Sequence, residues 1–200
     1  MILIIDYGVS NIKSVVLAIR EVSPFNVVVS NNPRDIRKAD KLILPGVCSY
    51  KSCIDNLERI NMVEPLREQV LVEKKTILGI CVGMQVFSTK GYENGVCGGL
   101  DIVKGEVIRL QAKKVPHMGW NKCVIKKQSK IFEGGKGNFF YFAHSYHFVP
   151  ENKNVISSVT YYETEMTATI EKDNVFGCQF HPERSGKEGL DVLRRFCNLL

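Results

Sequence analysis

Long hydrophobic runs are absent from this 200-residue sequence. No apolar stretch approaches the ~20 residues that a membrane-spanning helix needs, so we expect no insertion into a membrane. The chain starts Met-Ile-Leu-Ile-Ile and reaches Asp6 with only four apolar residues after Met1. That run is too short for a signal peptide and predicts a first β-strand.

Cysteine patterns that would indicate a disulfide framework or a metal site are also lacking. The seven cysteines are an odd number, none stands in a C-x-x-C motif, and none forms a zinc-like cluster with histidine. Reduced thiols are typical of proteins that stay in the cytoplasm, which is the location we expect. The sequence gives no reason to expect a metal ion or an organic cofactor.

Concentrated basic sequence is scarce as well. The formal net charge of +6 comes from lysines and arginines spread along the chain, and the densest stretch, 126–130, carries no interleaved aromatic residues. This pattern favours a solvated surface over a nucleic-acid site.

What the sequence does contain is a regular alternation of apolar runs and amphipathic segments in its first half. Apolar runs at 2–5, 25–29, 42–44 and 76–80 alternate with helical patterns at 12–19, 54–60 and 66–72. Ser10 is a candidate N-cap for the first helix. Continuously apolar strands separated by helices predict a largely parallel sheet covered on both faces.

The second half has a different texture. Short runs rich in β-branched and aromatic residues predict strands of a mixed sheet, followed by a C-terminal helix; the runs lie at 102–110, 139–148, 155–161, 166–170 and 175–180. No internal repeat or flexible linker interrupts the chain, so we expect residues 1–200 to form a single α/β domain, a flavodoxin-like three-layer sandwich.

A candidate nucleophile lies at the end of one predicted strand. The sequence Gly-Ile-Cys-Val-Gly at positions 79–83 places Cys81 between a strand and a helical pattern. Such a strand-turn-helix with flanking glycines is the setting of a nucleophile elbow, and a thiol at the start of a helix ionises more easily. A buried cysteine at a strand end fits this pattern equally well.

A candidate base follows one hundred residues later. His181 and Glu183 lie two positions apart at the end of an apolar strand, so on extended backbone both side chains point to the same side. The carboxylate can then orient the imidazole for proton transfer, and with Cys81 the pair suits covalent acyl transfer from an amide. On its own, His-Pro-Glu reads better as a turn with solvated charges, and this preference reverses only when the motif is joined to the elbow.

Together these motifs resemble the class I glutamine amidotransferases. Pro-Gly-Val at 45–47, the elbow at 79–85 and Gln-Phe-His-Pro-Glu at 179–183 match that family in order and spacing. The segments at 5–11, 115–121 and 141–146 are similar to the glutaminase subunit of imidazole glycerol phosphate synthase.

The resemblance implies a role for each matching position. Cys81 is implied as nucleophile, His181 as acid and base, and Glu183 as its orienting carboxylate. An oxyanion hole is implied for Val82, Gly46 and Val47, and a glutamine pocket for Gln85, Ser145 and Tyr146. A partner interface is implied for Asn11, Trp120, Tyr141 and Arg184. The implied partner is a TIM-barrel cyclase that receives ammonia in histidine biosynthesis, with which the chain would form a heterodimer. His117 and His144 are interpreted as structural.

Two positions depart from the pattern of that family. Cys48 stands where a glycine usually follows Pro-Gly-Val, and Arg184 stands where a lysine commonly follows His-Pro-Glu. Two alternatives therefore stay open. One is a related subunit that supplies ammonia to another synthase, such as a sugar-amidating enzyme, and the other is a catalytically silent regulatory subunit.

Overall fold

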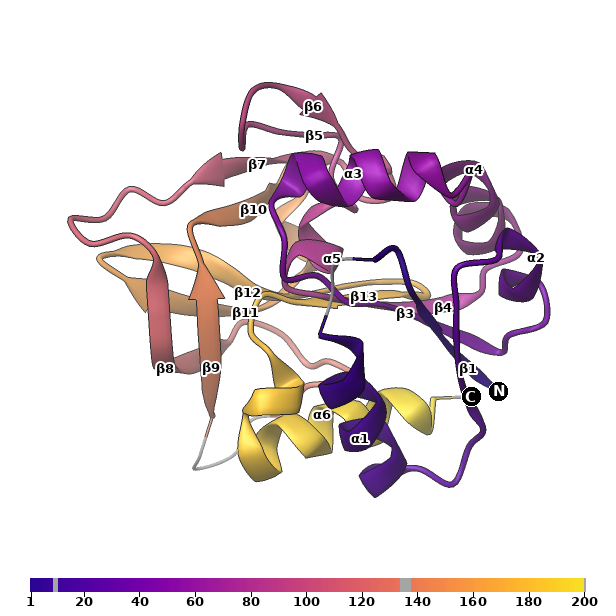
Figure 1. The fold of residues 1–200 in the computed structure, drawn as a ribbon. Coiled ribbons are helices and arrows are strands. Elements are labelled where there is room, and N and C mark those ends of the chain that lie inside the picture. The colour runs from indigo at the N-terminus through magenta and orange to yellow at the C-terminus, as the bar shows by residue number, and fades with distance from the viewer. Residues whose placement is uncertain (9–10, 134–137, 200) are drawn as a thin grey trace.

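The main sheet combines a parallel half and an antiparallel half (Figure 1). The computed structural model describes residues 1–8, 11–133 and 138–199, and in these residues the sheet has nine strands in the order β2-β1-β3-β4-β13-β12-β11-β8-β9. Its first five strands pair in parallel; they are β2 (Val27–Ser30), β1 (Ile2–Ile5), β3 (Lys41–Leu44), β4 (Thr76–Ile80) and β13 (Val175–Cys178). All of these strands except the edge strand β2 are almost continuously buried, as a sheet covered on both faces requires.

Antiparallel pairings extend the sheet on the far side of β13. The added strands are β12 (Thr164–Lys172), β11 (Ile156–Tyr162), β8 (His117–Ile125) and β9 (Phe139–His144). A smaller sheet of four strands lies beside it within the described residues, in the order β10 (Tyr146–Pro150), β7 (Gly105–Arg109), β5 (Lys90–Gly91) and β6 (Cys97–Gly98).

Helices cover both faces of the main sheet, as Figure 1 shows. On one face α1 (Ile12–Val22) packs against α6 (Gly186–Cys197). The other face carries α2 (Pro33–Ile36), α3 (Tyr50–Arg59), α4 (Val63–Arg67) with a π-helical turn at Glu68–Val72, and α5 (Val82–Gln85); short 3₁₀ turns lie at Lys153–Val155 and Pro182–Arg184. The prediction of a three-layer α/β sandwich is confirmed.

One predicted strand is wrong in an informative way. The aromatic run 139–148 forms two strands, β9 and β10, which belong to different sheets and meet at Ser145. No glycine or proline marks this break, because it is set by strand pairing and not by a turn motif. Strand β9 pairs with β8, whereas β10 pairs with β7. Strand β8 was not predicted, although its alternating exposure is visible once Trp120 and Met118 are seen on one face. Ser10, the predicted N-cap, lies outside the described residues, and α1 begins after Asn11.

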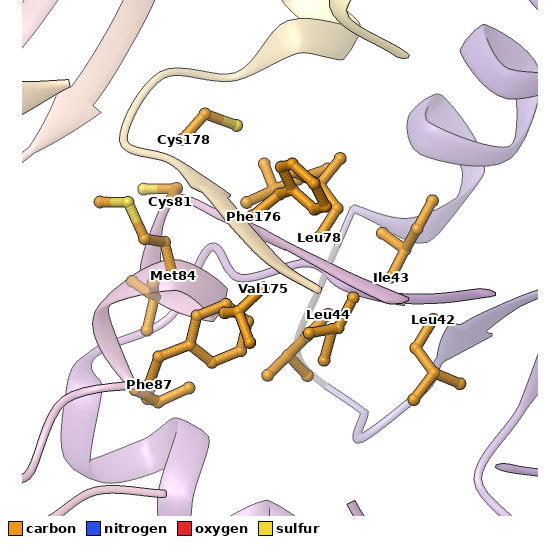
Figure 2. Packing of buried hydrophobic residues seen from close by; sticks show 14 of the residues in the cluster. Leu42, Ile43, Leu44, Leu78, Cys81, Met84, Phe87, Val175, Phe176 and Cys178 are labelled. Carbon is orange, nitrogen blue, oxygen red and sulfur yellow. The ribbon is translucent and has the colours of Figure 1, made fainter. Parts of the chain in front are cut away.

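A single hydrophobic cluster joins the two halves of the chain. It includes apolar side chains from β1, β3 and β4 together with those of β13 and α6. Figure 2 shows Met84 and Phe87 close to Val175, on the side of the sheet where the chain turns after Cys81. The turn after β4 therefore rests on packed core and not on a mobile loop.

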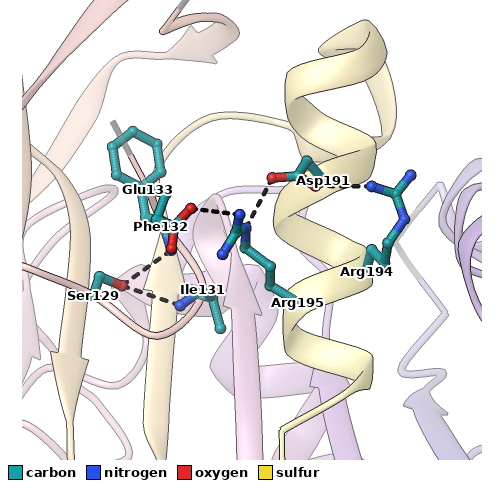
Figure 3. A network of polar contacts seen from close by, with 7 residues as sticks. All are labelled: Ser129, Ile131, Phe132, Glu133, Asp191, Arg194 and Arg195. Carbon is teal, nitrogen blue, oxygen red and sulfur yellow. Dashed lines mark hydrogen bonds and ion pairs between the residues drawn. The ribbon is translucent and has the colours of Figure 1, made fainter. Parts of the chain in front are cut away.

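Polar contacts fasten α6 to the segment before the undescribed residues 134–137 (Figure 3). Arg195 binds Asp191 of the same helix at 2.8 Å and Glu133 at 2.6 Å, and Arg194 also binds Asp191 at 2.8 Å. These pairs are largely exposed, so each contributes at most about 1 kcal/mol. In the described part of the chain no helix combines the length and apolar character needed to cross a membrane.

Candidate active site

Cys81 occupies a strained turn between β4 and α5. Its backbone has φ 54° and ψ −112°, in the left-handed half of conformational space that a residue with a Cβ rarely adopts. The amide of Cys81 donates to the carbonyl of Cys178 at 2.7 Å, which holds the turn to the neighbouring strand β13. The side chain thus stands at the carboxyl edge of the sheet, directly before the first N–H groups of a helix.

Close backbone packing explains the two glycines of this turn. A Cβ at Gly79 would lie 2.6 Å from the amide nitrogen of Met84, and one at Gly83 would lie 1.8 Å from the carbonyl oxygen of Leu44. The prediction that these glycines make room for a sharp turn agrees with these distances.

Gly46 brings the Pro-Gly-Val segment against the same turn. A Cβ on Gly46 would meet Gly83 N at 2.6 Å and Val82 Cβ at 2.8 Å. The Tyr7 hydroxyl donates to the carbonyl of Pro45 at 2.6 Å and lies 3.9 Å from the sulfur of Cys48. The backbone after β3 is therefore held beside the start of α5, where the sequence predicts an oxyanion hole.

His181 and Glu183 form the predicted pair, but on a different backbone. Nδ1 of His181 lies 2.9 Å from Oε1 of Glu183, and both side chains are buried. Extended backbone was expected here. Instead, a 3₁₀ turn at Pro182–Arg184 follows His181 and brings the carboxylate back to the ring. The amide of His181 also donates to the carbonyl of Tyr141 at 2.9 Å, which ties this turn to β9.

The electrostatics of the imidazole favour its charged form. Burial by itself lowers the pKa of His181, but hydrogen bonding and charge interaction with Cys81 and Glu183 outweigh it and raise the pKa to about 10. Because Nδ1 is bound to Glu183, Nε2 is the nitrogen left to face the thiol. His181 therefore interacts with the Glu183 carboxylate on one side and with the Cys81 thiol on the other.

A pocket of about 340 Å³ opens over the thiol. Its lining includes Cys81, His181 and six of the residues predicted for the oxyanion hole, the glutamine pocket or the interface, namely Val47, Val82, Gln85, Ser145, Tyr146 and Arg184. Gly46 and Glu183 are adjacent to it through Val82 and His181.

Several further residues in or beside this pocket were not predicted to belong to it, among them His144, interpreted from the sequence as structural, Gln179 and Glu93. Gln179 donates from Nε2 to the sulfur of Cys81 at 3.5 Å and accepts at Oε1 from Gln85 at 3.0 Å. Glu93 lines the pocket and accepts from the amide of Tyr50 at 2.7 Å. The position of Gln179, two residues before His181 at the end of a strand, was the available signal; nothing local marks Glu93.

The predicted interface residues do not all lie together: Trp120 and Tyr141 are in contact, whereas Arg184 and Asn11 lie elsewhere. Trp120 is 57% exposed and contacts Tyr141 edge to face, with ring centroids 6.3 Å apart across the β8-β9 pair. Arg184 is exposed at the pocket rim, whereas Asn11, before α1, does not line the pocket. Exposed Met118 lies near Trp120 on β8, so this strand presents apolar side chains to solvent.

Metal ligands are not gathered anywhere in the described residues: no group of three or more His, Cys, Asp or Glu side chains has the spacing of a metal site.

Comparison with known proteins agrees with this geometry. The model of the family described as "Glutamine amidotransferase class-I" matches residues 3–199. The chain belongs to the class I glutamine amidotransferase family. Residues of the elbow, the Pro-Gly-Val turn and the His-Pro-Glu segment converge on one pocket in this amidotransferase.

Curated relatives match the amidotransferase over nearly its whole length. The protein named "Imidazole glycerol phosphate synthase subunit HisH" from Pelagibacter ubique is 45% identical, with 98% of each chain covered. "Imidazole glycerol phosphate synthase subunit HisH 1" of Campylobacter jejuni is 44% identical, with both chains fully covered. The HisH protein of Aquifex aeolicus is 47% identical over 96% of this chain and 94% of its own.

Solved structures support the fold alone. "Structure of PurLQS from Thermotoga maritima" matches with a TM-score of 0.74 at 19% identity, covering 98% of this chain and 96% of that one. "Crystal structure of glutamine amidotransferase" matches with a TM-score of 0.73 at 13% identity, covering 97% and 96%.

Proposed function

We propose that this chain is the glutaminase subunit of an imidazole glycerol phosphate synthase and supplies ammonia for histidine biosynthesis. The observation that carries the proposal is that His181, bound to Glu183, interacts with Cys81 in the pocket of a chain whose full-length relatives bear that subunit's name. It acts as a single domain of residues 1–200, in keeping with the shared core.

The catalytic roles follow from the geometry. The Cys81 thiolate attacks the side-chain amide of glutamine, and the His181 imidazolium protonates the leaving ammonia. Water, deprotonated by the now neutral imidazole, then attacks the thioester and releases glutamate. Glu183 keeps the ring oriented and stabilises its positive charge throughout, without accepting the proton itself.

The oxyanion of the tetrahedral intermediate forms next to Cys81 and therefore lies beside the start of α5. The first N–H groups of a helix have no intrahelical acceptor, so the N–H of Val82 is available to the oxyanion. A second donor comes from the Gly46-Val47 turn, which packs against Val82. Each such donor contributes roughly 10²–10³ in turnover.

Substrate recognition is assigned to the other polar residues that line the pocket. Glu93 is the carboxylate among the described lining residues and, with the amide oxygen of Gln85, suits the α-ammonium of glutamine, while the backbone at Ser145 and Tyr146 holds its remaining polar atoms. Gln179 acts beside them as a hydrogen-bond donor to the sulfur.

The ammonia is delivered to a partner cyclase subunit. This partner is proposed because the relatives are named as one subunit of a synthase. We assign the partner a TIM-barrel fold, a cytoplasmic location in common with this chain, and a contact surface that includes Asn11, Trp120, Tyr141 and Arg184. The exposed aromatic pair Trp120 and Tyr141 supports this surface, because aromatic side chains are enriched at protein interfaces.

Affinity capture combined with activity measurement tests the proposal. The tagged chain should recover the cyclase subunit, and the pair should form imidazole glycerol phosphate from glutamine or from ammonium salts. Cys81→Ala should lose the glutamine-dependent reaction and retain the ammonium-dependent one, whereas Cys123→Ala, a buried thiol on β8, should retain both. Capture of a sugar-amidating synthase would redirect the proposal to another acceptor, and loss of both reactions in Cys81→Ala would refute the assigned role.

A further inference from the structure

A chain of hydrogen bonds joins two histidines that the proposed mechanism does not use. Nδ1 of His117 lies 3.0 Å from Nε2 of His144, and Nδ1 of His144 lies 2.9 Å from the carbonyl oxygen of Tyr146. On the other side, Nδ2 of Asn121 lies 3.2 Å from Nε2 of His117. Both imidazoles are buried, with 2% and 6% of their surfaces exposed.

The contacts allow one assignment of the ring protons when both rings are neutral. A carbonyl oxygen only accepts, so Nδ1 of His144 carries the hydrogen and Nε2 is an acceptor. His117 must then donate from Nδ1, which leaves its Nε2 to accept from Asn121. Each residue therefore fixes the tautomer of the next.

The surroundings keep both rings neutral. Burial lowers the pKa of His117 to about 4. Burial also lowers that of His144 to about 3, opposed by the Tyr146 carbonyl and aided by the charges of His117, His147 and His181. His117 is further enclosed by stacking on Phe142 and Tyr162, at centroid distances of 4.8 and 4.2 Å.

The carbonyl at the end of this chain belongs to the proposed glutamine pocket. Tyr146 O accepts a second hydrogen bond, from Nε2 of Gln85 at 2.7 Å, and the same Nε2 donates to Oε1 of Gln179 at 3.0 Å. Both hydrogens of the Gln85 amide are then used, so its oxygen is the atom left for a ligand. An oxygen here suits an ammonium group, as does the nearby Glu93 carboxylate.

We propose that Asn121, His117 and His144 are positioning residues that hold the Tyr146 carbonyl, and through it the Gln85 amide, in the orientation that presents Oε1 to the α-ammonium of glutamine. This role rests on the glutaminase function proposed above. It extends the glutamine site to strand β8, whose neighbouring side chain Trp120 is exposed to solvent.

Substitutions at His144 give the direct test, with His147 as matched control. His147 lies on β10, is also buried, and has a pKa lowered to about 4 by burial, but its Nδ1 has no hydrogen-bond partner among the described residues. In complex with the cyclase, His144→Phe should raise KM for glutamine about fivefold, the order expected for one net hydrogen bond, with kcat changed less than twofold. His144→Asn keeps a donor near the Nδ1 position and should recover most of the affinity, while His147→Phe should leave KM unchanged.

A purely structural role predicts other results. In that case His144→Phe and His147→Phe would lower the melting temperature while KM stayed at the wild-type value, or both would change KM alike; either result would overturn the proposal. An unchanged KM in His144→Phe would do so regardless of stability.

A measurement independent of turnover separates this inference from the proposed function. Nitrogen-15 chemical shifts of the histidine rings in the isolated chain should show His117 and His144 as neutral Nδ1–H tautomers, and glutamine titrated into Cys81→Ala should bind about fivefold more weakly when His144→Phe is added. An Nε2–H tautomer at either ring would refute the positioning role even in an active enzyme. A wild-type chain that binds glutamine but hydrolyses none in the presence of the cyclase would instead refute the function.

Discussion

Replacing Glu183 by glutamine isolates the charge of the buried carboxylate from its shape. Oε1 of Glu183 lies 2.9 Å from Nδ1 of His181, and the side chains are 1% and 5% exposed. A glutamine oxygen can still accept from Nδ1–H, so the ring keeps its orientation. Oε2 of Glu183 has no hydrogen-bond partner among the described residues, so the new amide group displaces no existing contact.

The loss is the difference between a charged and a neutral hydrogen bond to the imidazolium. Hydrogen bonds to charged groups contribute about 1.5–3 kcal/mol, and part of this disappears in Glu183→Gln. At 1.36 kcal/mol per pKa unit, the pKa of His181 should fall by about one to two units from its raised value near 10. The fall has this sign because removing a neighbouring negative charge disfavours the protonated ring.

Two assays report the change. The alkaline limb of the kcat profile, which follows deprotonation of His181, should move to lower pH by that amount, and kcat near neutral pH should fall about 10- to 100-fold without vanishing. Glu183→Ala, which also removes the orienting acceptor, should lose more. Glu188→Gln in the first turn of α6 makes the same charge change away from the ring and should behave as wild type. Wild-type rates and an unmoved alkaline limb in Glu183→Gln would refute the triad role.

Three further predictions follow from the packing and the exposed surface. Gly83→Ala puts a Cβ 1.8 Å from a backbone oxygen, so it should lower the free energy of unfolding by about 1–3 kcal/mol and abolish glutaminase activity. Gly98→Ala, where the Cβ meets no atom within 4 Å, should leave stability and activity unchanged. Equal stability of the two variants in thermal unfolding would contradict the packing argument. Trp120→Ala should weaken cyclase binding and the stimulation of glutaminase by cyclase ligand, and unchanged titrations would remove Trp120 from the interface. Cys48→Gly frees the backbone after Pro-Gly-Val, the turn that supplies the proposed second oxyanion donor. It should alter the ratio of the glutaminase rate with cyclase and its ligand to the rate without them at saturating glutamine; identical ratios would mean that this turn does not control the stimulation.

The sequence predicted the parallel half of the fold and the groups that we propose as reacting groups. Strands 2–5, 42–44 and 76–80 were recognisable because each is continuously apolar and buried on both faces, which is a local property of the residues. The elbow was recognisable in part for the same reason, since Gly79 is needed by the turn itself. These signals do not depend on knowing which distant segment lies beside them, whereas Gly83 is required by the approach of Leu44 from β3.

The tertiary structure decided where the remaining residues go. The run 139–148 divides at Ser145 only because β8 and β7 offer two different partners. Gln179 reaches the site 98 residues after Cys81, Glu93 reaches it from the segment between β5 and β6, and the Glu183 carboxylate reaches His181 through a 3₁₀ turn. Likewise, His117 and His144 look like separate core histidines in the sequence and become one hydrogen-bonded chain only across the β8-β9 pair. Hydrogen bonds of this kind require the donor and acceptor atoms to be placed to within a few tenths of an ångström. Local sequence patterns do not encode that placement, whereas strand pairing fixes it.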